Sequence, residues 1–512
     1  MSRVSTSSVF PLEAGHSDFV FNTPTRNNVP KAELIVDPAC PVEFKETLQH
    51  YIDSGAIKVV ANVPADTVIV EPPEKVLKDT FAKYGKKFCS APWNALWTSA
   101  DGKVKFCCAS TQVLGTTEDK FENIVNSPIA KEIRLQFLKN EQPATCEQCW
   151  EREKAGNSSS SARTLANLQG CDVIKDSLAD TNHDTGEIKK HNLKFFDIIW
   201  TNKCNFACLH CIPSLSSTIN NSYKDVYSKW LYKSDVNNAW DQADPDTVDN
   251  SDKIEYILKN AATLDQLHFN GGEPFLQKET FILLDELMKA GYNNKINLWF
   301  HTNGSVRTYK NIDIVEEYLK KWGDNTMIIM SHDHFGARGE YFRYGYREDK
   351  WIENFNRFYE AGINLKVSAS LTLFNAPTMH KLFEWYAVND ISTRASIDVN
   401  NVTGPKVWNF LNLSVDEKLK ALTKRSMSWC YQHFVGRDRA GLIEIANCSA
   451  MLDMPFDYLD LAEDFVKSID AIDNKRNTSF VDVFPELEPL YTKLKNNEYK
   501  FDFKFDQRNS SR

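Results

Sequence analysis

Three cysteines within one run of eight residues are the part of this sequence best suited to chemistry. Cys204, Cys208 and Cys211 are spaced C-x3-C-x2-C. Thiolates are soft ligands for iron–sulfur clusters and for zinc, so three of them in one loop can bind a single metal centre. A structural zinc site is closed by four protein ligands, whereas a cluster held by three keeps one iron available for a substrate or cofactor. The spacing favours such a cluster over three reduced, buried thiols.

A glycine-rich turn lies further along the chain. Gly271, Gly272, Glu273 and Pro274 directly follow residues 266–270, whose apolar and aromatic pattern predicts a strand. Two glycines allow the backbone to approach a ligand closely, and their carbonyls can accept hydrogen bonds from an ammonium group. The proline makes continuation of the strand unfavourable. The pattern predicts a ligand-binding turn at the end of a strand.

Together the two motifs resemble the signatures of the radical S-adenosylmethionine (radical SAM) superfamily. In that family the open iron of a 4Fe-4S cluster binds the amino and carboxylate groups of SAM, and reduction then releases a 5′-deoxyadenosyl radical. His210 occupies the position before the last cysteine, which is usually aromatic, and Gly271 to Pro274 resemble the motif that holds the methionine amine. The resemblance implies an enzyme with a catalytic 4Fe-4S cluster, SAM, and an electron donor such as flavodoxin or ferredoxin.

Alternating strand and helix patterns surround these motifs, as in a parallel α/β barrel. The resemblance implies the partial (β/α)6 TIM barrel of the family, in which the chemistry lies at the carboxyl ends of the strands. Predicted strands begin with the apolar run 193–200 that precedes the cysteine loop. The others cover 266–270, 296–300, 327–331, 365–371 and 395–399, and the helices between them lie near 277–291, 310–322, 348–361 and 377–388.

Four further residues are implied by the resemblance to line the same rim. Thr302 and Asn303 correspond to positions near the adenosine, and Ser331 and Arg343 to positions that contact the ribose and carboxylate of SAM. Arginine suits a carboxylate because its planar guanidinium can donate two parallel hydrogen bonds. The alternative for each is a solvated loop residue or a structural hydrogen bond.

A second cysteine group precedes the predicted barrel. Gly102 is predicted at the tip of a hairpin that brings Cys89 and Cys107 together, and the later pair Cys146 and Cys149 can complete a four-thiolate site. This group resembles the twitch domain, a shortened SPASM domain that binds an auxiliary 4Fe-4S cluster. Cys108 is an alternative to Cys107, and a four-cysteine zinc site remains open because zinc accepts the same ligands. In better-known SPASM enzymes this domain follows the barrel.

The organisation of the chain follows from these assignments. The prediction is a flexible N-terminus, a small folded segment, the twitch/SPASM-like domain, a linker, the radical SAM barrel and a helical C-terminal extension, at 1–30, 31–80, 81–165, 166–192, 193–402 and 403–512. Helices are expected near 128–140, 414–433 and 456–472. An acidic insertion at 234–252 is expected to be a solvated loop rather than a lid.

Composition narrows the compartment and the partners. A net charge of −9 argues against a general nucleic-acid-binding surface. No stretch approaches the roughly 20 apolar residues needed to cross a membrane, and twelve cysteines without a secretory signal indicate a reducing cytoplasm.

Twitch and SPASM enzymes often modify peptides, so the resemblance implies hydrogen abstraction from a peptide or protein substrate. Two alternatives stay open. One is a radical SAM enzyme that acts on a small molecule such as a sugar or nucleotide. The other is a non-enzymatic, zinc-stabilised interaction protein in which both cysteine groups are structural.

Overall fold

Six parallel strands form the centre of the computed structural model, which describes residues 33–34, 58–59, 73–154, 161–226, 243–402, 404–434, 440–453 and 461–496. The strands lie side by side in chain order, so each connection is a parallel crossover. They are β6 (Phe195–Ile199), β8 (Gln266–Asn270), β9 (Asn297–Thr302), β12 (Thr326–Ser331), β14 (Asn364–Leu371) and β15 (Ser396–Asn401). The predicted barrel strands are therefore present, with ends that differ by only a few residues.

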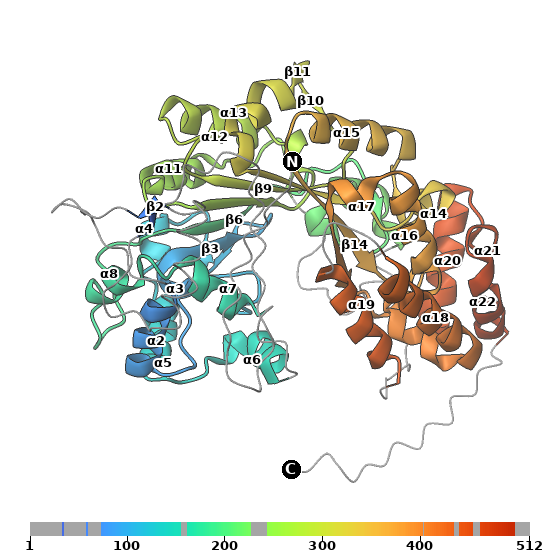
Figure 1. Cartoon of the computed structure of the whole chain (residues 1–512), viewed down its shortest axis with the longest axis horizontal. Coiled ribbons are helices and arrows are strands. Elements are labelled where there is room, and N and C mark those ends of the chain that lie inside the picture. The colour runs from blue at the N-terminus through green and yellow to red at the C-terminus, as the bar shows by residue number, and fades with distance from the viewer. Residues whose placement is uncertain are drawn as a thin grey trace, which may run out of the picture.

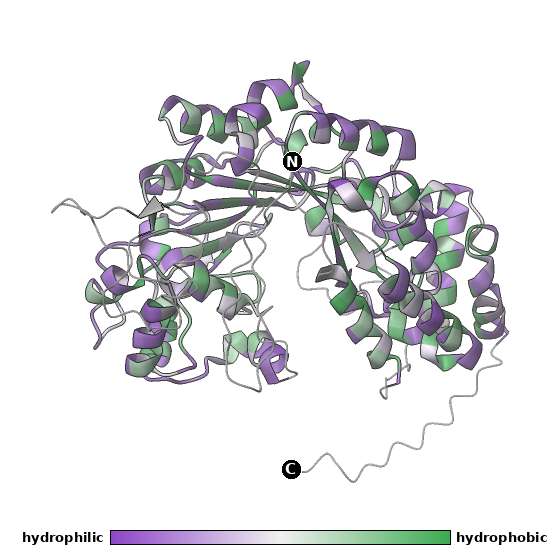
Figure 2. Cartoon of the chain, viewed as in Figure 1, coloured by the Kyte–Doolittle hydropathy of each residue, from purple (hydrophilic) through white to green (hydrophobic). Residues whose placement is uncertain are grey.

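The two faces of this sheet differ in burial. In β14 buried residues alternate with partly exposed ones, and β8 and β9 show the same pattern. Successive strand side chains point to opposite faces, so one face is buried and the other meets solvent. Figure 2 shows apolar residues concentrated in the strands, while the helices mix apolar and polar residues. The strands do not close into a full barrel, so this face stays partly open to solvent.

Helices on the buried face complete the crossovers. Figure 1 shows α11, α12, α13 and α15 along one side of the sheet. The helices associated with the strands are α9 (Ser217–Ser222), α11 (Ser251–Asn260), α12 (Lys278–Lys289), α13 (Lys320–Trp322), α14 (Gly336–Phe342), α15 (Glu348–Glu360), α16 (Met379–Val388) and α17 (Ile391–Arg394). The predicted helix near 310–322 is divided, because the π-helical turn η5 (Val315–Leu319) precedes α13.

The segment that contains the second cysteine group is continuous with the barrel sheet. Strand β3 (Ala95–Thr98) pairs in parallel with β6, and β4 (Lys103–Lys105) and β5 (Gly115–Thr116) extend the same sheet in antiparallel fashion. Gly102 lies in the turn between β3 and β4 with φ of 77°, a conformation that favours glycine. The predicted hairpin is therefore present. The predicted boundary at 166–192, by contrast, does not separate two independent sheets.

Residues 166–192, which the sequence predicted to be a linker, contain helical structure. Helix α7 (Ala162–Gln169) begins before this segment, and α8 (Ile174–Ala179) lies within it. Ser90 donates its backbone N–H to Asn167 Oδ1 at 2.7 Å, and the amide of Asn167 donates to Phe88 O at 3.0 Å. The segment packs on the chain around Cys89, because its polar side chains satisfy that buried backbone.

The remaining helices flank the two ends of the sheet. In the cysteine-rich region these are α2 (Pro73–Tyr84), α3 (Ala91–Asn94), α4 (Phe121–Ile124), α5 (Pro128–Leu138) and α6 (Glu147–Lys154). The C-terminal extension contains α18 (Glu417–His433), α19 (Ala440–Met451), α20 (Leu461–Arg476), α21 (Phe480–Val483) and α22 (Glu488–Lys495). Figure 1 shows α18 to α22 beside the β14 end of the sheet. Two-residue strands β1 (Glu33–Leu34) and β2 (Lys58–Val59) pair in parallel. The predictions for residues 1–30, and for most of 31–80, lie outside the described residues.

Candidate functional site

The first cysteine loop begins where β6 ends. The short strand β7 (Ala207–Cys208) within it pairs with β13 (Arg343–Tyr344), and this pairing places Cys208 opposite Arg343. Cys204 is fixed differently, because its carbonyl accepts a hydrogen bond from Thr218 Oγ1 at 2.7 Å. Cys208 is buried, whereas Cys204 and Cys211 are partly exposed. The loop therefore holds its middle cysteine within protein and presents the outer two toward solvent.

The three thiols interact electrostatically. Burial is the main reason that the pKa of each is raised, and it brings the pKa of Cys211 to about 12. Cys208 raises the pKa of both neighbours further, as like charges disfavour a second thiolate. In the described part of the chain no group of three or more His, Cys, Asp or Glu side chains is arranged to hold a metal ion. The donor set nevertheless fits an iron–sulfur cluster, whose positive irons stabilise thiolates.

The glycine turn after β8 packs directly against this loop. Gly271 has φ of 69° and Gly272 has φ of 55°. A Cβ atom on Gly272 would lie 2.4 Å from the carbonyl oxygen of Lys203, so no larger residue fits there. The adjacent Glu273 N–H donates to that same oxygen at 2.8 Å. Both glycines are thus required for the turn to reach the cysteine loop.

Glu273 is a buried carboxylate that organises the rim. It accepts hydrogen bonds from Thr302 Oγ1 at 2.8 Å and from the Asn303 backbone N–H at 2.8 Å. Burial raises the pKa of Glu273 to about 7, although these hydrogen bonds oppose the shift. Pro274 begins the short helical turn η4 (Pro274–Leu276) that ends the strand. Thr302 and Asn303 therefore hold the glycine turn, and their contact with adenosine stays a prediction.

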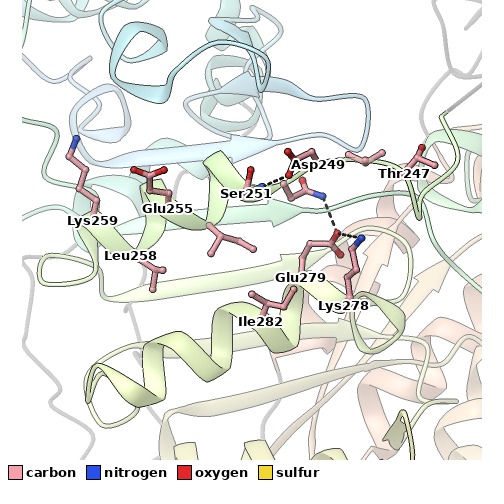
Figure 3. Close-up of a pocket in the computed structure, with 12 residues that line it drawn as sticks. Thr247, Asp249, Ser251, Glu255, Leu258, Lys259, Lys278, Glu279 and Ile282 are labelled. Carbon is pink, nitrogen blue, oxygen red and sulfur yellow. Dashed lines mark hydrogen bonds and ion pairs between the residues drawn. The ribbon is translucent and has the colours of Figure 1, made fainter.

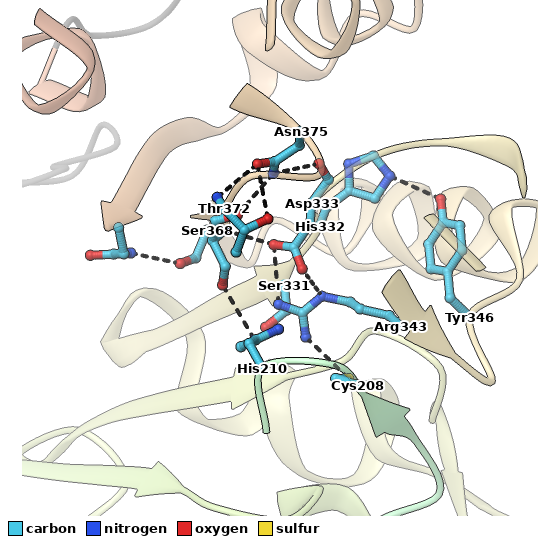
Figure 4. Close-up of polar contacts among 12 residues, drawn as sticks. Cys208, His210, Ser331, His332, Asp333, Arg343, Tyr346, Ser368, Thr372 and Asn375 are labelled. Atoms are coloured by element: carbon cyan, nitrogen blue, oxygen red, sulfur yellow. Dashed lines mark hydrogen bonds and ion pairs between the residues drawn. The ribbon is translucent and has the colours of Figure 1, made fainter. Parts of the chain in front are cut away.

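Arg343 has a different partner from the predicted SAM carboxylate. Its Nε and Nη2 donate to the two carboxylate oxygens of Asp333 at 2.6 and 3.2 Å, and its Nη1 lies 3.8 Å from the sulfur of Cys208 (Figure 4). Both side chains are buried, so the two-pronged geometry is already used within the protein. The contact of Arg343 with the SAM carboxylate stays a prediction. The charge of Arg343 lowers the pKa of the Cys208 thiol, against the dominant effect of burial.

His210 and Ser331 lie on the same side of the site (Figure 4). The His210 ring stacks on Phe342 with centroids 4.9 Å apart, and its Nε2 lies 3.4 Å from Ser370 Oγ. Burial lowers the pKa of His210 to about 4, and its buried Nδ1 has no hydrogen-bond partner among the described residues. A neutral ring with one unsatisfied nitrogen can receive a hydrogen bond from, or donate one to, a bound molecule. Ser331 ends β12, and its carbonyl accepts the indole N–H of Trp351.

The second cysteine group also comes together in space. Burial raises the pKa of Cys89 and Cys107, and the pKa of Cys146 rises to about 12 for the same reason. Nearby thiols add to each shift: Cys146 and Cys149 act on Cys89, and Cys89 acts on Cys107. Cys108 is exposed. Apart from burial, the largest effect on the pKa of Cys108 comes from Asp197 rather than from Cys89. Cys149 also acts on Cys108, so both residues lie near the group, and the choice of Cys107 as the ligand stays a prediction.

Polar residues that no motif indicated line the partly exposed face of the sheet. Asp197 lies beside His268 in the strand register, and its carboxylate accepts the Asn270 amide at 2.6 Å. Burial raises the pKa of Asp197 to about 7. The rings of His268 and His301 lie 4.6 Å apart. The alternation of polar with apolar positions along these strands was the signal in the sequence for this face. The same face carries Lys366, Ser368, Ser370 and Asp398.

A separate cavity of about 770 Å³ lies between α11 and the start of α12 (Figure 3). Val248, Ile254, Leu258 and Ile282 supply its apolar lining. None of the cysteines and none of the residues of the glycine turn lines it. Only part of the acidic insertion can be placed relative to this cavity. Its residues 234–242 lie outside the described residues. Asp246 pairs with Lys203, beside the cysteine loop, at 2.6 Å.

No helix in the described residues is both long enough and apolar enough to span a membrane. The comparisons with known proteins agree with the two cysteine sites. Residues 198–386 match the model of the radical SAM superfamily, and residues 89–150 match the model of the SPASM iron–sulfur cluster-binding domain. No curated protein matches the chain. The predicted fold class, enzyme class and cofactors, a 4Fe-4S cluster with SAM and an auxiliary cluster, are thereby confirmed.

Solved structures resemble only part of the chain. Native anSMEcpe with bound AdoMet and Cp18Cys peptide is 17% identical over 47% of this chain and 60% of its own, with a TM-score of 0.32. Streptococcus suis SuiB bound to precursor peptide SuiA is 13% identical over 60% of this chain and 64% of its own, with a TM-score of 0.33. The chain thus spans less than two thirds of either structure.

Proposed function

We propose that this radical SAM enzyme reductively cleaves SAM and uses the resulting 5′-deoxyadenosyl radical to abstract a hydrogen atom from a peptide or protein. Cys204, Cys208 and Cys211 would hold the catalytic 4Fe-4S cluster, which supplies the electron for SAM cleavage. The observation that carries this proposal is the contact between the cysteine loop and the glycine turn, through the carbonyl of Lys203. It brings an open cluster site and a candidate SAM-binding turn to one rim.

The residues around the cluster would orient SAM and exclude water. Gly271 and Gly272 bring the backbone to the rim, and Glu273 fixes that turn through Thr302 and Asn303. In this proposal the glycine turn accepts hydrogen bonds from the methionine amine of SAM. Thr302, Asn303 and Ser331 lie beside the rest of the cofactor. His210 contributes a neutral ring above Phe342. The hydrogen-abstraction chemistry belongs to the bound cofactor, and the chain supplies its position.

The auxiliary cluster would be held by Cys89, Cys107, Cys146 and Cys149 in a twitch-type domain at 81–165, ahead of the barrel at 193–402. Mutual electrostatic effects among these thiols support one shared site. The pairing of β3 with β6 joins the two cysteine regions through one sheet. The alternative is a zinc site, and metal analysis would distinguish it from an iron–sulfur cluster.

The partly exposed face of the sheet is where we place the substrate. Small-molecule pockets bury most of their ligand. Here partly exposed side chains extend from β8 to β15, a surface on which an extended peptide can lie. This observation favours a peptide or protein over a sugar or nucleotide. Asp197, with its raised pKa, could exchange a proton with the substrate.

A reducing, cytoplasmic setting and a flavodoxin- or ferredoxin-like electron donor complete the proposal. All eleven cysteines in the described residues are free of disulfides, which supports this compartment. We propose neither a membrane nor nucleic acid as a partner. The electron donor would be identified by testing which reduced protein supports SAM cleavage.

One anaerobic experiment tests the function. The chain is reconstituted with iron and sulfide, reduced with dithionite and mixed with SAM, and 5′-deoxyadenosine is measured by liquid chromatography. We expect its formation, together with about eight irons per chain for two clusters. A colourless, zinc-loaded chain that leaves SAM intact would instead establish the structural zinc alternative. Mass spectrometry of peptides and metabolites from treated extract would then separate peptide from small-molecule substrates.

A further inference from the structure

Two side chains of the C-terminal extension hydrogen-bond to the catalytic cysteine loop. Arg476 Nη2 donates to the carbonyl of Ala207 at 2.8 Å, and the indole Nε1 of Trp408 donates to the carbonyl of Leu209 at 3.0 Å. These carbonyls belong to the residues immediately before and after Cys208. The middle cysteine of the loop is therefore fixed from both sides by residues far away in the sequence.

Arg476 is held firmly in its position at the end of α20. Its Nη1 donates to the carbonyl of Tyr341 at 2.7 Å, and its guanidinium lies over the rings of Tyr223 and Tyr344, at 5.1 and 4.7 Å from their centroids. Only 9% of Arg476 is exposed. A buried arginine that bridges two backbone carbonyls is well placed to fix their separation, because its planar donor groups have set directions.

Trp408 is equally constrained. It is fully buried in the short helix η8 (Lys406–Trp408), and its ring packs against Phe374 and Phe465, with centroids 4.9 and 6.0 Å apart. The indole N–H is its only polar donor, and it is directed at the cysteine loop. A packed ring cannot easily follow a moving loop, so this hydrogen bond fixes the Leu209 carbonyl relative to the core.

Neither residue lies in the segment 198–386 that matches the radical SAM model. We propose that Arg476 and Trp408 are positioning residues, by which the C-terminal extension holds the loop around Cys208 in the conformation that binds the catalytic cluster. This inference rests on the proposed function and assigns a role to the extension. Outer groups that orient metal ligands commonly affect metal binding strongly.

The test compares full-length Arg476→Gln, Arg476→Lys and Trp408→Phe with the wild-type chain. Arg338→Gln is the matched control, because Arg338 also joins the barrel to the extension, through two hydrogen bonds to Glu486, without touching the cysteine loop. Each protein is reconstituted anaerobically. Iron per chain and the electron paramagnetic resonance spectrum of the reduced protein, with and without SAM, are then measured.

We expect Arg476→Gln to retain the auxiliary cluster but lose most of the catalytic one, so that bound iron falls by about half. Arg476→Lys should restore part of this iron, because lysine keeps the charge but not the two-carbonyl bridge. Trp408→Phe should keep its ring packing and show an intermediate loss. The Arg338→Gln control should bind iron like the wild type. Survival of the auxiliary signal shows that the variant has folded.

A second measurement uses cluster-free protein. Backbone amides of the loop should exchange hydrogen about ten times faster in Arg476→Gln and Trp408→Phe than in wild type, and those of β14 should not. Wild-type iron content, spectra and exchange in all variants would overturn the inference while leaving the function intact. A wild-type chain that binds no catalytic cluster would instead refute the proposed function itself.

Discussion

The carboxylate of Glu273 accepts the backbone N–H of Asn303 at 2.8 Å, so the turn after β8 is joined directly to the end of β9. The carboxylate is fully buried, and the hydrogen bond crosses between neighbouring strands of the barrel. An acidic residue at this position therefore sets the shape of the rim, in addition to any contact with a cofactor. Replacing it should disturb the glycine turn before it disturbs the sheet.

Glu273→Gln should weaken SAM binding by about five- to 150-fold. Both carboxylate oxygens accept hydrogen bonds, whereas the glutamine amide replaces one of them with a donating NH₂ group. Losing a buried hydrogen bond costs about 1–3 kcal/mol. Calorimetric titration of SAM into reconstituted protein measures the effect. Glu286→Gln is the control, since Glu286 pairs with Lys289 on the exposed side of α12. Equal SAM affinity in the two variants would show that Glu273 does not shape the binding turn.

We expect the main effect of Arg343→Ala to be a lower free energy of unfolding rather than a loss of direct contacts with SAM. The substitution leaves the Asp333 carboxylate buried without its cation, which typically costs about 3–5 kcal/mol. Urea unfolding of the cluster-free chain provides the measurement. Arg347→Ala removes the exposed pair with Asp349 and should leave the midpoint unchanged. If Arg343→Ala kept wild-type stability but lost SAM affinity, the result would support the predicted contact of Arg343 with the SAM carboxylate.

Cys107→Ala and Cys108→Ala should behave differently, although the residues are adjacent. Cys107 interacts electrostatically with Cys89 and Cys149. Cys108 is exposed, and apart from burial its pKa is affected most by Asp197. We expect Cys107→Ala to lose about four irons per chain and Cys108→Ala to lose none. Iron and sulfide analysis distinguishes them. The reverse result would make Cys108 the ligand.

Asp197→Asn should reduce the pH dependence of stability. Burial raises the pKa of Asp197 from 3.8 to about 7, so the folded chain binds a proton more tightly than the unfolded chain. The resulting stabilisation is fully present below pH 3.8 and is lost as the pH rises through about 7. It amounts to no more than about 4 kcal/mol. Unfolding of the cluster-free wild type and variant at about pH 5 and about pH 8 checks this, because only the wild type gains Asp197 charge between them. Parallel changes in the two proteins would place Asp197 in a more solvated setting.

Local sequence patterns were sufficient for the strands and the glycine turn. The segment 266–270 coincides with β8, because its apolar positions alternate and a Gly-Gly-Glu-Pro turn ends it. The helix near 310–322 was predicted less well, since a π-helical turn interrupts it. The helical structure within the predicted linker at 166–192 was not predicted, because it is stabilised by contacts with the chain around Cys89, which no local pattern records.

The sequence by itself determined the chemistry of the two cysteine groups, because ligand type and spacing are properties of a short stretch of chain. It also determined the order of strands and helices, since periodicity is local. Only the tertiary structure decided which partners each polar side chain has. Arg343 forms an ion pair with Asp333, and Arg476 reaches a loop 269 residues away. Such pairings depend on which elements pack together, and packing is a property of the whole chain.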